Sequence, residues 1–356
     1  MDDRSFSAAQ DFLLSVKTFW TVDVFTKVKE EYQANIGNLD NSSSETREIE
    51  DLLSDSTTFQ YFAWLERHLQ RFKYSGRYGI NTYYSEKRNT FSNILSNEER
   101  SEDYLELTQG FELPDYYRSV DIHQHPGGLW GDEIAGLVYE RGARTTTPLM
   151  GSAHKDLHHR FTDLALKDIS TPKDILDMGC GFGKSTKPFY DILNESKIEA
   201  IDLSEPCLKL AAHDAAETQR KNVKFRQINA LETKYDNESF DLVTSTMLIH
   251  ELPAKEIGKM FAEAERVLRP GGRMVHLDFY SLPDEFTKFI HYGHSERNNE
   301  PFMKGFAELD LHELLTEKGF INISIVPFSE AEGVDPNNHS YWRFPWTLIA
   351  ADKEVF

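Results

Sequence analysis

Three glycines at alternate positions follow a short apolar run that contains Asp177. The run covers residues 175–178, the glycines are Gly179, Gly181 and Gly183, and a helical pattern begins directly afterwards. Glycine lets the backbone turn sharply and approach a ligand closely, and the N-terminus of a helix presents free N–H groups beside it. This turn from strand to helix therefore predicts a binding site for a nucleotide-like ligand.

The same kind of turn serves other ligands, so the glycines alone do not identify one. Dinucleotide-binding folds use the spacing G-x-G-x-x-G, whereas the spacing here is G-x-G-x-G. The run Gly183-Lys184-Ser185 is similar to the end of a phosphate loop, but no first glycine stands in the required frame. A dinucleotide-binding domain stays open as an alternative at this point.

Two further polar positions follow the next apolar runs. Asp202 closes the run over residues 198–202, so its carboxylate and that of Asp177 would stand at one edge of a parallel sheet. A carboxylate at this place can accept hydrogen bonds from both ribose hydroxyls of an adenosine. Asn229 and Ala230 follow a third run, where an amide could bind the adenine. Together these positions favour an adenosine-containing ligand more specifically than the glycines do.

His250 is the best candidate for a general base. It belongs to the segment 246–251, which follows a fourth apolar run at residues 240–245. Ligands of open parallel sheets lie outside the carboxyl ends of the strands, and imidazole titrates near neutral pH. His250 could therefore deprotonate a hydroxyl, an amine or an acidic carbon, or could serve only packing. Glu251 could orient His250 or simply be solvated.

The secondary-structure elements that must position these residues follow two different patterns along the chain. Apolar residues at three- and four-residue steps predict helices at about 6–32, 57–74, 83–95 and 99–107, with a loop at 35–46. From about residue 150, short apolar runs alternate with helical segments. The runs at 175–178, 198–202, 223–228, 240–245, 273–277, 321–326 and 342–350 predict strands, and the segments at 184–193, 206–218, 255–268 and 309–318 predict helices. Alternation of this kind builds a parallel sheet with helices on both faces.

We therefore expect an α/β fold with a helical N-terminal domain at 1–150 and a ligand-binding domain at 151–356. Residues 112–148 are rich in Pro, Gly, His and aromatic side chains and predict a lid with one helix at about 132–141. The stretch His123-Gln124-His125-Pro126-Gly127-Gly128-Leu129-Trp130 could contact a substrate or be a fixed crossing between the domains. The helical domain would cap the substrate pocket or form a homodimer.

Composition excludes several classes of function. The chain has 39 Lys and Arg against 59 Asp and Glu, a formal charge of −20, which makes nucleic acid a poor partner. Only Cys180 and Cys207 occur, without the spacing of a disulfide framework or a thiolate metal site. The acidic start is wrong for a secretory leader, and no apolar run reaches the length of a membrane helix. A cytoplasmic protein without membrane contact is expected.

Four of these segments resemble successive motifs of the class I S-adenosylmethionine-dependent methyltransferase family, in the family's order. They are Ile175-Leu176-Asp177-Met178-Gly179-Cys180-Gly181-Phe182-Gly183, Ile201-Asp202-Leu203-Ser204, Phe240-Asp241-Leu242-Val243 and Val267-Leu268-Arg269-Pro270-Gly271-Gly272. The resemblance covers residues 150 to 350. It implies a Rossmann-like seven-stranded sheet with the last strand antiparallel, S-adenosylmethionine as cofactor, and methyl transfer to a small-molecule substrate.

The resemblance also implies a set of cofactor-binding residues: Asp177, Gly179, Cys180, Gly181, Gly183, Asp202, Leu203, Asn229, Ala230 and Met247. The glycine turn would hold the methionine moiety, Asp202 the ribose, and Asn229 with Ala230 the adenine. The adenine-binding residue is often Asp in the family, so Asn229 would have to donate or accept through its amide.

Three alternatives to simple base-assisted methyl transfer stay open. A C-methylating subset of the family uses iron or a similar ion to acidify a keto-type substrate, and here His250 with His291 or His294, and Glu251 or Asp278, could bind a divalent or ferric ion. The chain could bind S-adenosylmethionine without transferring methyl. It could also be a non-methylating enzyme, such as a cyclase or decarboxylase, on the same scaffold.

Overall fold

The computed structural model describes residues 1–36, 46–95, 103–146 and 154–355. The strands are β1 (Leu105–Glu106), β2 (Asp174–Met178), β3 (Lys197–Asp202), β4 (Val223–Gln227), β5 (Phe240–Thr246), β6 (Leu268–Phe279), β7 (Phe320–Pro327) and β8 (Trp346–Lys353). The α-helices are α1 (Asp3–Phe19), α2 (Phe25–Asn35), α3 (Thr46–Leu53), α4 (Thr57–Tyr74), α5 (Ile80–Glu86), α6 (Arg88–Leu95), α8 (Asp115–Arg118), α9 (Ala135–Ala143), α10 (His154–Ala165), α11 (Lys187–Ile192), α12 (Glu205–Thr218), α13 (Ala254–Val267), α14 (Glu285–Asn298), α15 (Met303–Ala307) and α16 (Leu311–Glu317).

One sheet organises the molecule, with the strand order β1-β4-β3-β2-β5-β6-β8-β7. Strands β1 to β6 pair in parallel, and β8 runs antiparallel to both β6 and β7. The antiparallel last strand confirms the expected architecture. After β2 the chain adds β3 and β4 on one side and then returns to place β5 on the other side of β2. This switch point opens a crevice at the carboxyl ends of β2 and β5.

The eighth strand is β1, which the sequence did not predict. It pairs with β4, Leu105 opposite Phe225 and Glu106 opposite Arg226. The helix expected over 99–107 was wrong for residues 105 and 106, because their backbone groups pair with the edge strand β4. Residues 99–102 lie outside the described part of the chain. The loop predicted at 35–46 also lies mostly outside it.

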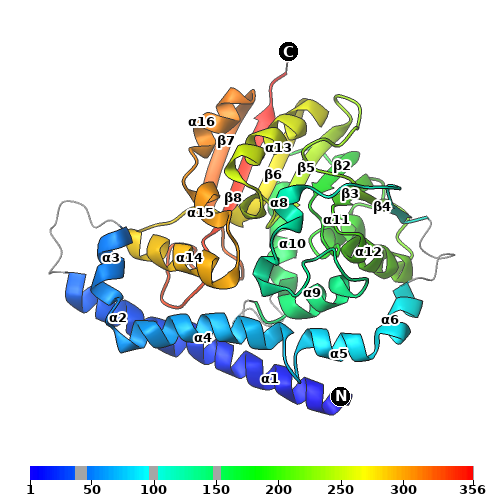
Figure 1. Ribbon diagram of the computed structural model, residues 1–356. Coiled ribbons are helices and arrows are strands. Elements are labelled where there is room, and N and C mark those ends of the chain that lie inside the picture. Colours follow the sequence, from blue (N-terminus) through cyan, green and yellow to red (C-terminus); the bar gives the residue numbers. More distant parts are fainter. Residues whose placement is uncertain (37–45, 96–102, 147–153, 356) are drawn as a thin grey trace.

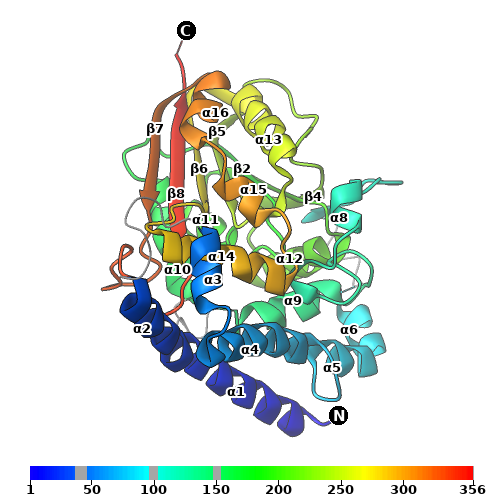
Figure 2. The same ribbon diagram turned by 60° about the vertical axis from the view of Figure 1, so that its left-hand side comes forward.

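The N-terminal helices cover the edge of the sheet at which the parallel strands end. Figures 1 and 2 show α1 and α2 end to end, with α4 alongside them and α5 beyond the end of α4, on the side opposite to the C-terminus. One hydrophobic cluster runs from these helices into the sheet and includes Trp20, Phe62, Ile175 and Trp342. The helices are thus packed against the remainder of the fold, and the division at residue 150 stays a prediction.

A π-helical turn, Trp20–Val24, joins α1 and α2. Such a turn holds an additional residue compared with an α-helical turn and frees a backbone carbonyl for another partner. The carbonyl of Thr21 accepts the backbone N–H of Trp342 at 3.0 Å. The first helix of the chain is thereby joined to the segment that precedes β8.

Two helices near the site, α14 and α15, were not predicted. Nine residues of α14 are buried, on more than one face, because the helix lies between α3, α4 and α15. A helix buried on several faces lacks the polar stripe that reveals a surface helix in the sequence. The 255–268 prediction was accurate, since α13 covers Ala254–Val267 and β6 begins at the next residue.

Candidate functional site

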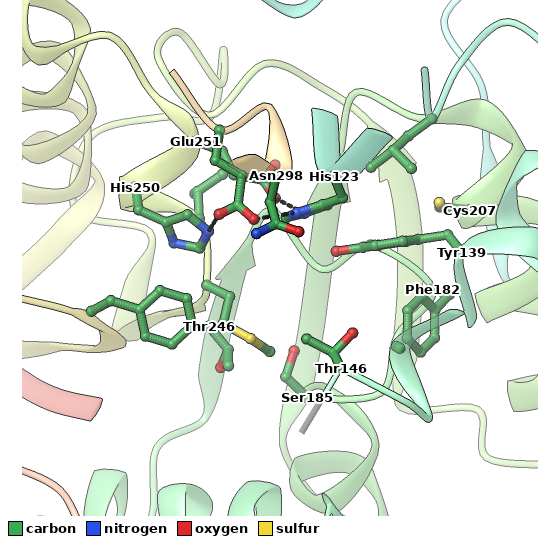
Figure 3. Close-up of a pocket in the computed structure, with 18 of the residues that line it drawn as sticks. His123, Tyr139, Thr146, Phe182, Ser185, Cys207, Thr246, His250, Glu251 and Asn298 are labelled. Atoms are coloured by element: carbon green, nitrogen blue, oxygen red, sulfur yellow. Dashed lines mark hydrogen bonds and ion pairs between the residues drawn. The ribbon is translucent and has the colours of Figure 1, made fainter. Parts of the chain in front are cut away.

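A cavity lies at the carboxyl ends of the central strands, between the sheet and the N-terminal helices. Its walls come from the glycine turn, the ends of β3 and β5, the segment after β4, the lid, α4 and the segment before β8. Figure 3 shows His250, Glu251 and Asn298 gathered on one side, and Tyr139 and Phe182 on the other. The cavity therefore joins the predicted cofactor residues to the predicted base.

The glycine turn contributes two positions that need glycine. Gly179 has φ +67°, and a Cβ there would stand 2.6 Å from a methyl carbon of Leu248. Gly181 has φ +51° and its N–H donates to Oδ2 of Asp202 at 2.8 Å. Both line the cavity, as does Cys180 between them. A side chain at Gly179 or Gly181 would strain the backbone at the cavity wall.

Asp202 lies at the end of β3, as the sequence predicted. Its Oδ1 accepts the N–H of Ser204 at 2.8 Å, and its Oδ2 accepts the N–H of Gly181. Burial raises the pKa of Asp202 to about 6, against the lowering effect of these two bonds. The carboxylate lines the cavity and keeps further lone pairs that can accept ribose hydroxyls.

Asp177 and Gly183 support the turn from behind and do not line the cavity. The carboxylate of Asp177 accepts the hydroxyls of Thr186 at 2.6 Å and Thr244 at 3.0 Å, and burial raises its pKa to about 6. Gly183 leaves room for Ala211 and Phe225, since its Cβ would stand 2.9 Å from that of Ala211. The structure thus places these two of the ten expected cofactor residues in supporting positions.

The remaining cofactor positions lie in the cavity wall: Leu203, Asn229, Ala230 and Met247. Oδ1 of Asn229 accepts the N–H of Leu231 at 2.9 Å, which leaves the amide N–H₂ group as its donor. Asn229 would therefore donate to a ring nitrogen. Met247 has φ +58°, an uncommon conformation for a residue other than glycine that often marks functional sites.

His250 forms a pair with Asp278, the second acidic residue at the end of a central strand. Nδ1 of His250 is 2.6 Å from Oδ1 of Asp278. The same oxygen accepts the backbone N–H of Phe279, and Oδ2 of Asp278 accepts the backbone N–H of Ile249. Burial alone would lower the pKa of His250, but the charge and hydrogen bond of Asp278 outweigh it and raise the pKa. Asp278 therefore fixes the N–H on Nδ1 and leaves Nε2 as the atom that can accept a proton.

Glu251 does not orient His250, contrary to one sequence interpretation. Its Oε1 lies 3.0 Å from Nε2 of His123, whose Nδ1 lies 3.0 Å from Oε1 of Glu300. Burial would lower the pKa of His123, but Glu300 and Glu251 raise it to about 10. His123 is therefore an imidazolium between two carboxylates, and its ring stacks on Tyr139 at 5.9 Å.

The same network continues into the N-terminal helices through Glu66. Nδ1 of His294 lies 2.7 Å from Glu66, which also pairs with Arg297, and Nε2 of His294 lies 3.5 Å from Glu300. Burial would lower the pKa of His294, but Glu300 and Glu66 raise it to about 9. Alternating charges thus connect α4, the lid and α14 around one end of the cavity.

Some residues of the lid line the cavity, and others pack behind its wall. His123 and Leu129 line the cavity, whereas His125 is buried against Tyr74 with ring centroids 5.1 Å apart. Ser204 donates to the carbonyl of Leu129 at 2.5 Å and so joins the lid to β3. Tyr139 and Thr146, near the end of the same segment, also line the cavity.

The histidines do not assemble a metal site. Within the part of the chain that the structure describes, no three His, Cys, Asp or Glu side chains form a group that could hold an ion. His294 carries a proton shared with carboxylates, and a protonated imidazole is no ligand. His291 is buried, its pKa is lowered by burial to about 3, and it does not line the cavity. The residues proposed for a divalent or ferric ion therefore do not fit it.

Three functional positions were missed or misjudged from the sequence. Asp278 ends β6 in the way that Asp202 ends β3, so the strand-end rule could have identified it as the partner of His250. Glu66 and Glu300 carry no such signal, because one lies on a helix face and the other follows the unpredicted α14. Their role follows only from the packing of helices around the cavity.

Three features of the cavity would suit an adenosyl ligand: a narrow glycine turn, a half-buried carboxylate at the end of β3 that accepts hydrogen bonds, and an amide after β4 that can donate one. A doubly wound sheet with this set of residues at its switch point defines a nucleotide-binding α/β domain. Residues 175–272 match the family model of the methyltransferase domain. This part of the chain is a class I S-adenosylmethionine-dependent methyltransferase domain.

Relatives that are named methyltransferases match part of the chain. It is 34% identical over 109 residues to the demethylmenaquinone methyltransferase of Lactococcus lactis subsp. lactis, covering 30% of this chain and 42% of that protein. It is 31% identical over 157 residues to the phthiotriol/phenolphthiotriol dimycocerosates methyltransferase of Mycobacterium leprae, covering 42% and 55%. The chain thus spans about half the length of these two relatives.

Solved structures show more distant similarity. Phosphoethanolamine N-methyltransferase 2 of Haemonchus contortus, in complex with S-adenosyl-L-methionine, matches with a TM-score of 0.42 and 16% identity, covering 56% of this chain and 52% of that one. Geranyl diphosphate C-methyltransferase of Streptomyces coelicolor A3(2) matches with a TM-score of 0.43 and 18% identity, covering 60% and 80%.

The helices of the described part include none with the length and apolar character needed to span a membrane.

The His123 network makes a prediction about stability at high pH. Because the folded-state pKa of His123 is raised to about 10, its ion pairs stabilise the fold fully below the unfolded value of about 6.5 and are lost as pH rises through about 10. His123→Gln is expected to lower Tm by roughly 5 °C or more at pH 7, since breaking a buried pair costs about 3–5 kcal/mol. The difference from the native protein should shrink near pH 10.5. A difference that stays constant from pH 7 to 10.5 in thermal unfolding would contradict the assignment.

Proposed function

We propose that this protein transfers the methyl group of S-adenosylmethionine to a small-molecule acceptor, with His250 as the general base. The observation that carries the proposal is the joining of two features in one cavity: the glycine turn with Asp202, and the His250–Asp278 pair at the neighbouring strand ends. The names of the two relatives, a demethylmenaquinone methyltransferase and a phthiotriol/phenolphthiotriol dimycocerosates methyltransferase, support an acceptor of this kind.

Cofactor binding is assigned to residues of the sheet edge. Asp202 would accept the ribose hydroxyls, Asn229 would donate to the adenine, and the turn at Gly179 to Gly181 would lie against the methionine moiety. Bound S-adenosylmethionine supplies an electrophilic methyl group. Asp177 would act indirectly, because its bonds to Thr186 and Thr244 fix the turn to the start of the following helix and to β5.

His250 would remove a proton from the acceptor as the new bond to carbon forms. Asp278 keeps the imidazole N–H on Nδ1, and Nε2 takes the proton from an oxygen, nitrogen or carbon acid. The positive charge that results on His250 is stabilised by Asp278, and Glu300 lies 3.9 Å from Nε2. Alignment of the acceptor with the methyl group would provide most of the remaining rate enhancement.

The N-terminal helices and the lid would exclude water from the cavity. Residues of α1, α4 and α9 line it together with the sheet edge, and the His123 network joins these elements. A drier cavity strengthens the electrostatic interaction of His250 with its carboxylates. Location in the cytoplasm and formation of a homodimer stay predictions from the sequence.

Two measurements test the proposal. Isothermal titration calorimetry of the purified chain is expected to show binding of S-adenosylmethionine and none of NAD; binding of NAD alone would overturn it in favour of a dinucleotide enzyme. Incubation with S-adenosylmethionine labelled in the methyl group and a metabolite extract is then expected to yield a labelled small molecule. Binding without any transfer would identify a protein that only binds the cofactor.

A further inference from the structure

Two lysines of the N-terminal helices line the same cavity as His250. Lys17 lies on α1 and is 7% exposed, and Lys73 lies on α4 and is 1% exposed. Lysine is almost never buried to this extent unless a carboxylate or another acceptor pairs with it. The protein itself supplies few such partners for these two side chains.

The ammonium group of Lys73 has no hydrogen bond or ion pair with any residue that the structure describes. Its Nζ lies 4.6 Å from the centroid of the Tyr74 ring. Lys17 has one long hydrogen bond, 3.4 Å from Nζ to Oε1 of Gln70. An ammonium group that loses its water without gaining partners is costly, so both lysines point to an acceptor that enters the cavity.

The carboxylates around this end of the cavity already have other cations as partners. Glu66 pairs with His294 and Arg297, Glu251 pairs with His123, and Glu300 lies between His123 and His294. These three carboxylates are matched by three cations. The charges of the two lysines are additional to this network and are not neutralised by it.

The pKa shifts of the two lysines agree with their burial and their lack of anionic partners. Burial lowers the pKa of Lys17 to about 8, although Glu66 acts in the opposite direction. Burial and the charge of Lys17 lower the pKa of Lys73 well below its ordinary value. The two ammonium groups therefore repel each other, and this repulsion favours the neutral form of Lys73. An anion bound between the two lysines would raise both pKa values and restore their protonation.

A continuous row of aromatic rings leads from this end of the cavity to His250. Trp20 contacts Trp342 at 5.0 Å between ring centroids, Trp342 contacts Phe344 at 4.8 Å, and Phe344 contacts Phe279 at 4.1 Å. Phe279 then contacts His250 at 4.7 Å. All five rings line the cavity and give it a wall suited to a flat apolar molecule.

We propose that the methyl acceptor is an apolar, ring-containing anion, whose carboxylate or phosphate binds Lys73 and Lys17 while its body lies along the aromatic row. This inference rests on the proposed function and names the substrate class of the same site. Lys73 and Lys17 are binding residues in it and take no part in proton transfer.

The test compares charged and neutral molecules of the same shape. Full-length protein saturated with S-adenosylhomocysteine is titrated with 2-naphthoate and with 2-naphthamide, and binding is followed by tryptophan fluorescence, since Trp20 and Trp342 line the cavity. The carboxylate is expected to bind at least about tenfold more tightly than the amide. 2-Naphthyl phosphate forms a third arm and distinguishes a preference for phosphate from one for carboxylate.

Lys73→Met tests whether this preference comes from the proposed site. It is expected to reduce the affinity for 2-naphthoate about tenfold or more and to leave that for 2-naphthamide within about twofold. Methionine fills a similar volume without a buried charge, so Tm should not fall. Arg71→Met is the matched control, because it removes the same charge from an exposed position of α4. Lys17→Met provides a second, independent variant.

Proton uptake gives a readout that packing alone would not change. Calorimetry at pH 8 in two buffers of different ionisation enthalpy should show uptake when 2-naphthoate binds, and none for Lys73→Met. Equal affinity for naphthoate, naphthyl phosphate and the amide in the native protein would overturn the proposal, as would an anion preference that persists in both lysine variants. Failure of S-adenosylhomocysteine to bind would instead count against the proposed function, since the naphthalene titrations can be run without it.

Discussion

Replacing His250 with asparagine is expected to lower turnover about 100-fold or more while leaving the affinity for S-adenosylmethionine within about twofold. Asparagine can still donate a hydrogen bond to Asp278 from the position of Nδ1, so the local structure is kept while the accepting nitrogen, Nε2, is lost. Single-turnover transfer of labelled methyl and calorimetric titration measure the two quantities separately. His312→Asn, at an exposed position of α16, is the control.

The pH dependence of turnover distinguishes a base from a packing residue. Because Asp278 raises the pKa of His250, the neutral, active form accumulates only above the ordinary value of 6.5, and turnover should rise with pH through a midpoint above it. Asp278→Asn removes the carboxylate and should move that midpoint downwards. If His250→Asn kept near-native turnover, His250 would have no role in proton transfer.

The second large effect is expected at Asp202. Asp202→Ala should reduce the affinity for S-adenosylmethionine about 100-fold or more, because two hydrogen bonds to a charged group contribute about 1.5–3 kcal/mol each. Since burial raises the pKa of this carboxyl to about 6, the affinity of the native protein should also decline as pH falls through about 6. Calorimetry from pH 5 to 8 measures both.

Asp177→Asn is the control that separates binding from support. Asp177 does not line the cavity, and its carboxylate bonds to Thr186 and Thr244. The variant should therefore lower Tm and retain more affinity than Asp202→Ala. An Asp202→Ala protein with undiminished affinity would mean that the adenosyl group binds elsewhere.

Local sequence was sufficient to predict the strands β2 to β8 and the sheet edge that carries the proposed cofactor residues. Each of the predicted parallel strands is a short run with apolar residues between turn signals, and the proposed ligand residues lie at or just after the strand ends. The sheet itself therefore brings Gly179, Asp202 and Asn229 together. The same rule placed His250 at the end of β5. In these cases sequence neighbours and spatial neighbours nearly coincide.

The contacts between distant segments could not be predicted. The sequence left open whether Glu251 orients its neighbour His250 or is solvated, whereas in the structure its partner is His123, from the lid. α14 was missed because it is buried on several faces, and with it the bridge of Glu300 and His294 to Glu66. Such pairings depend on how helices pack around the cavity, for which the sequence carries no periodic signal.

The π-helical turn at Trp20–Val24 has a consequence for the length of the first helix. Its extra residue turns α2 by about 100° relative to an uninterrupted α-helix and leaves the Thr21 carbonyl to hold Trp342. Deleting one residue here would restore regular winding, rotate the apolar stripe of α2 outwards and release the tail segment that carries Trp342. A single surplus residue near the start of the chain thus sets the position of an aromatic wall built more than three hundred residues later.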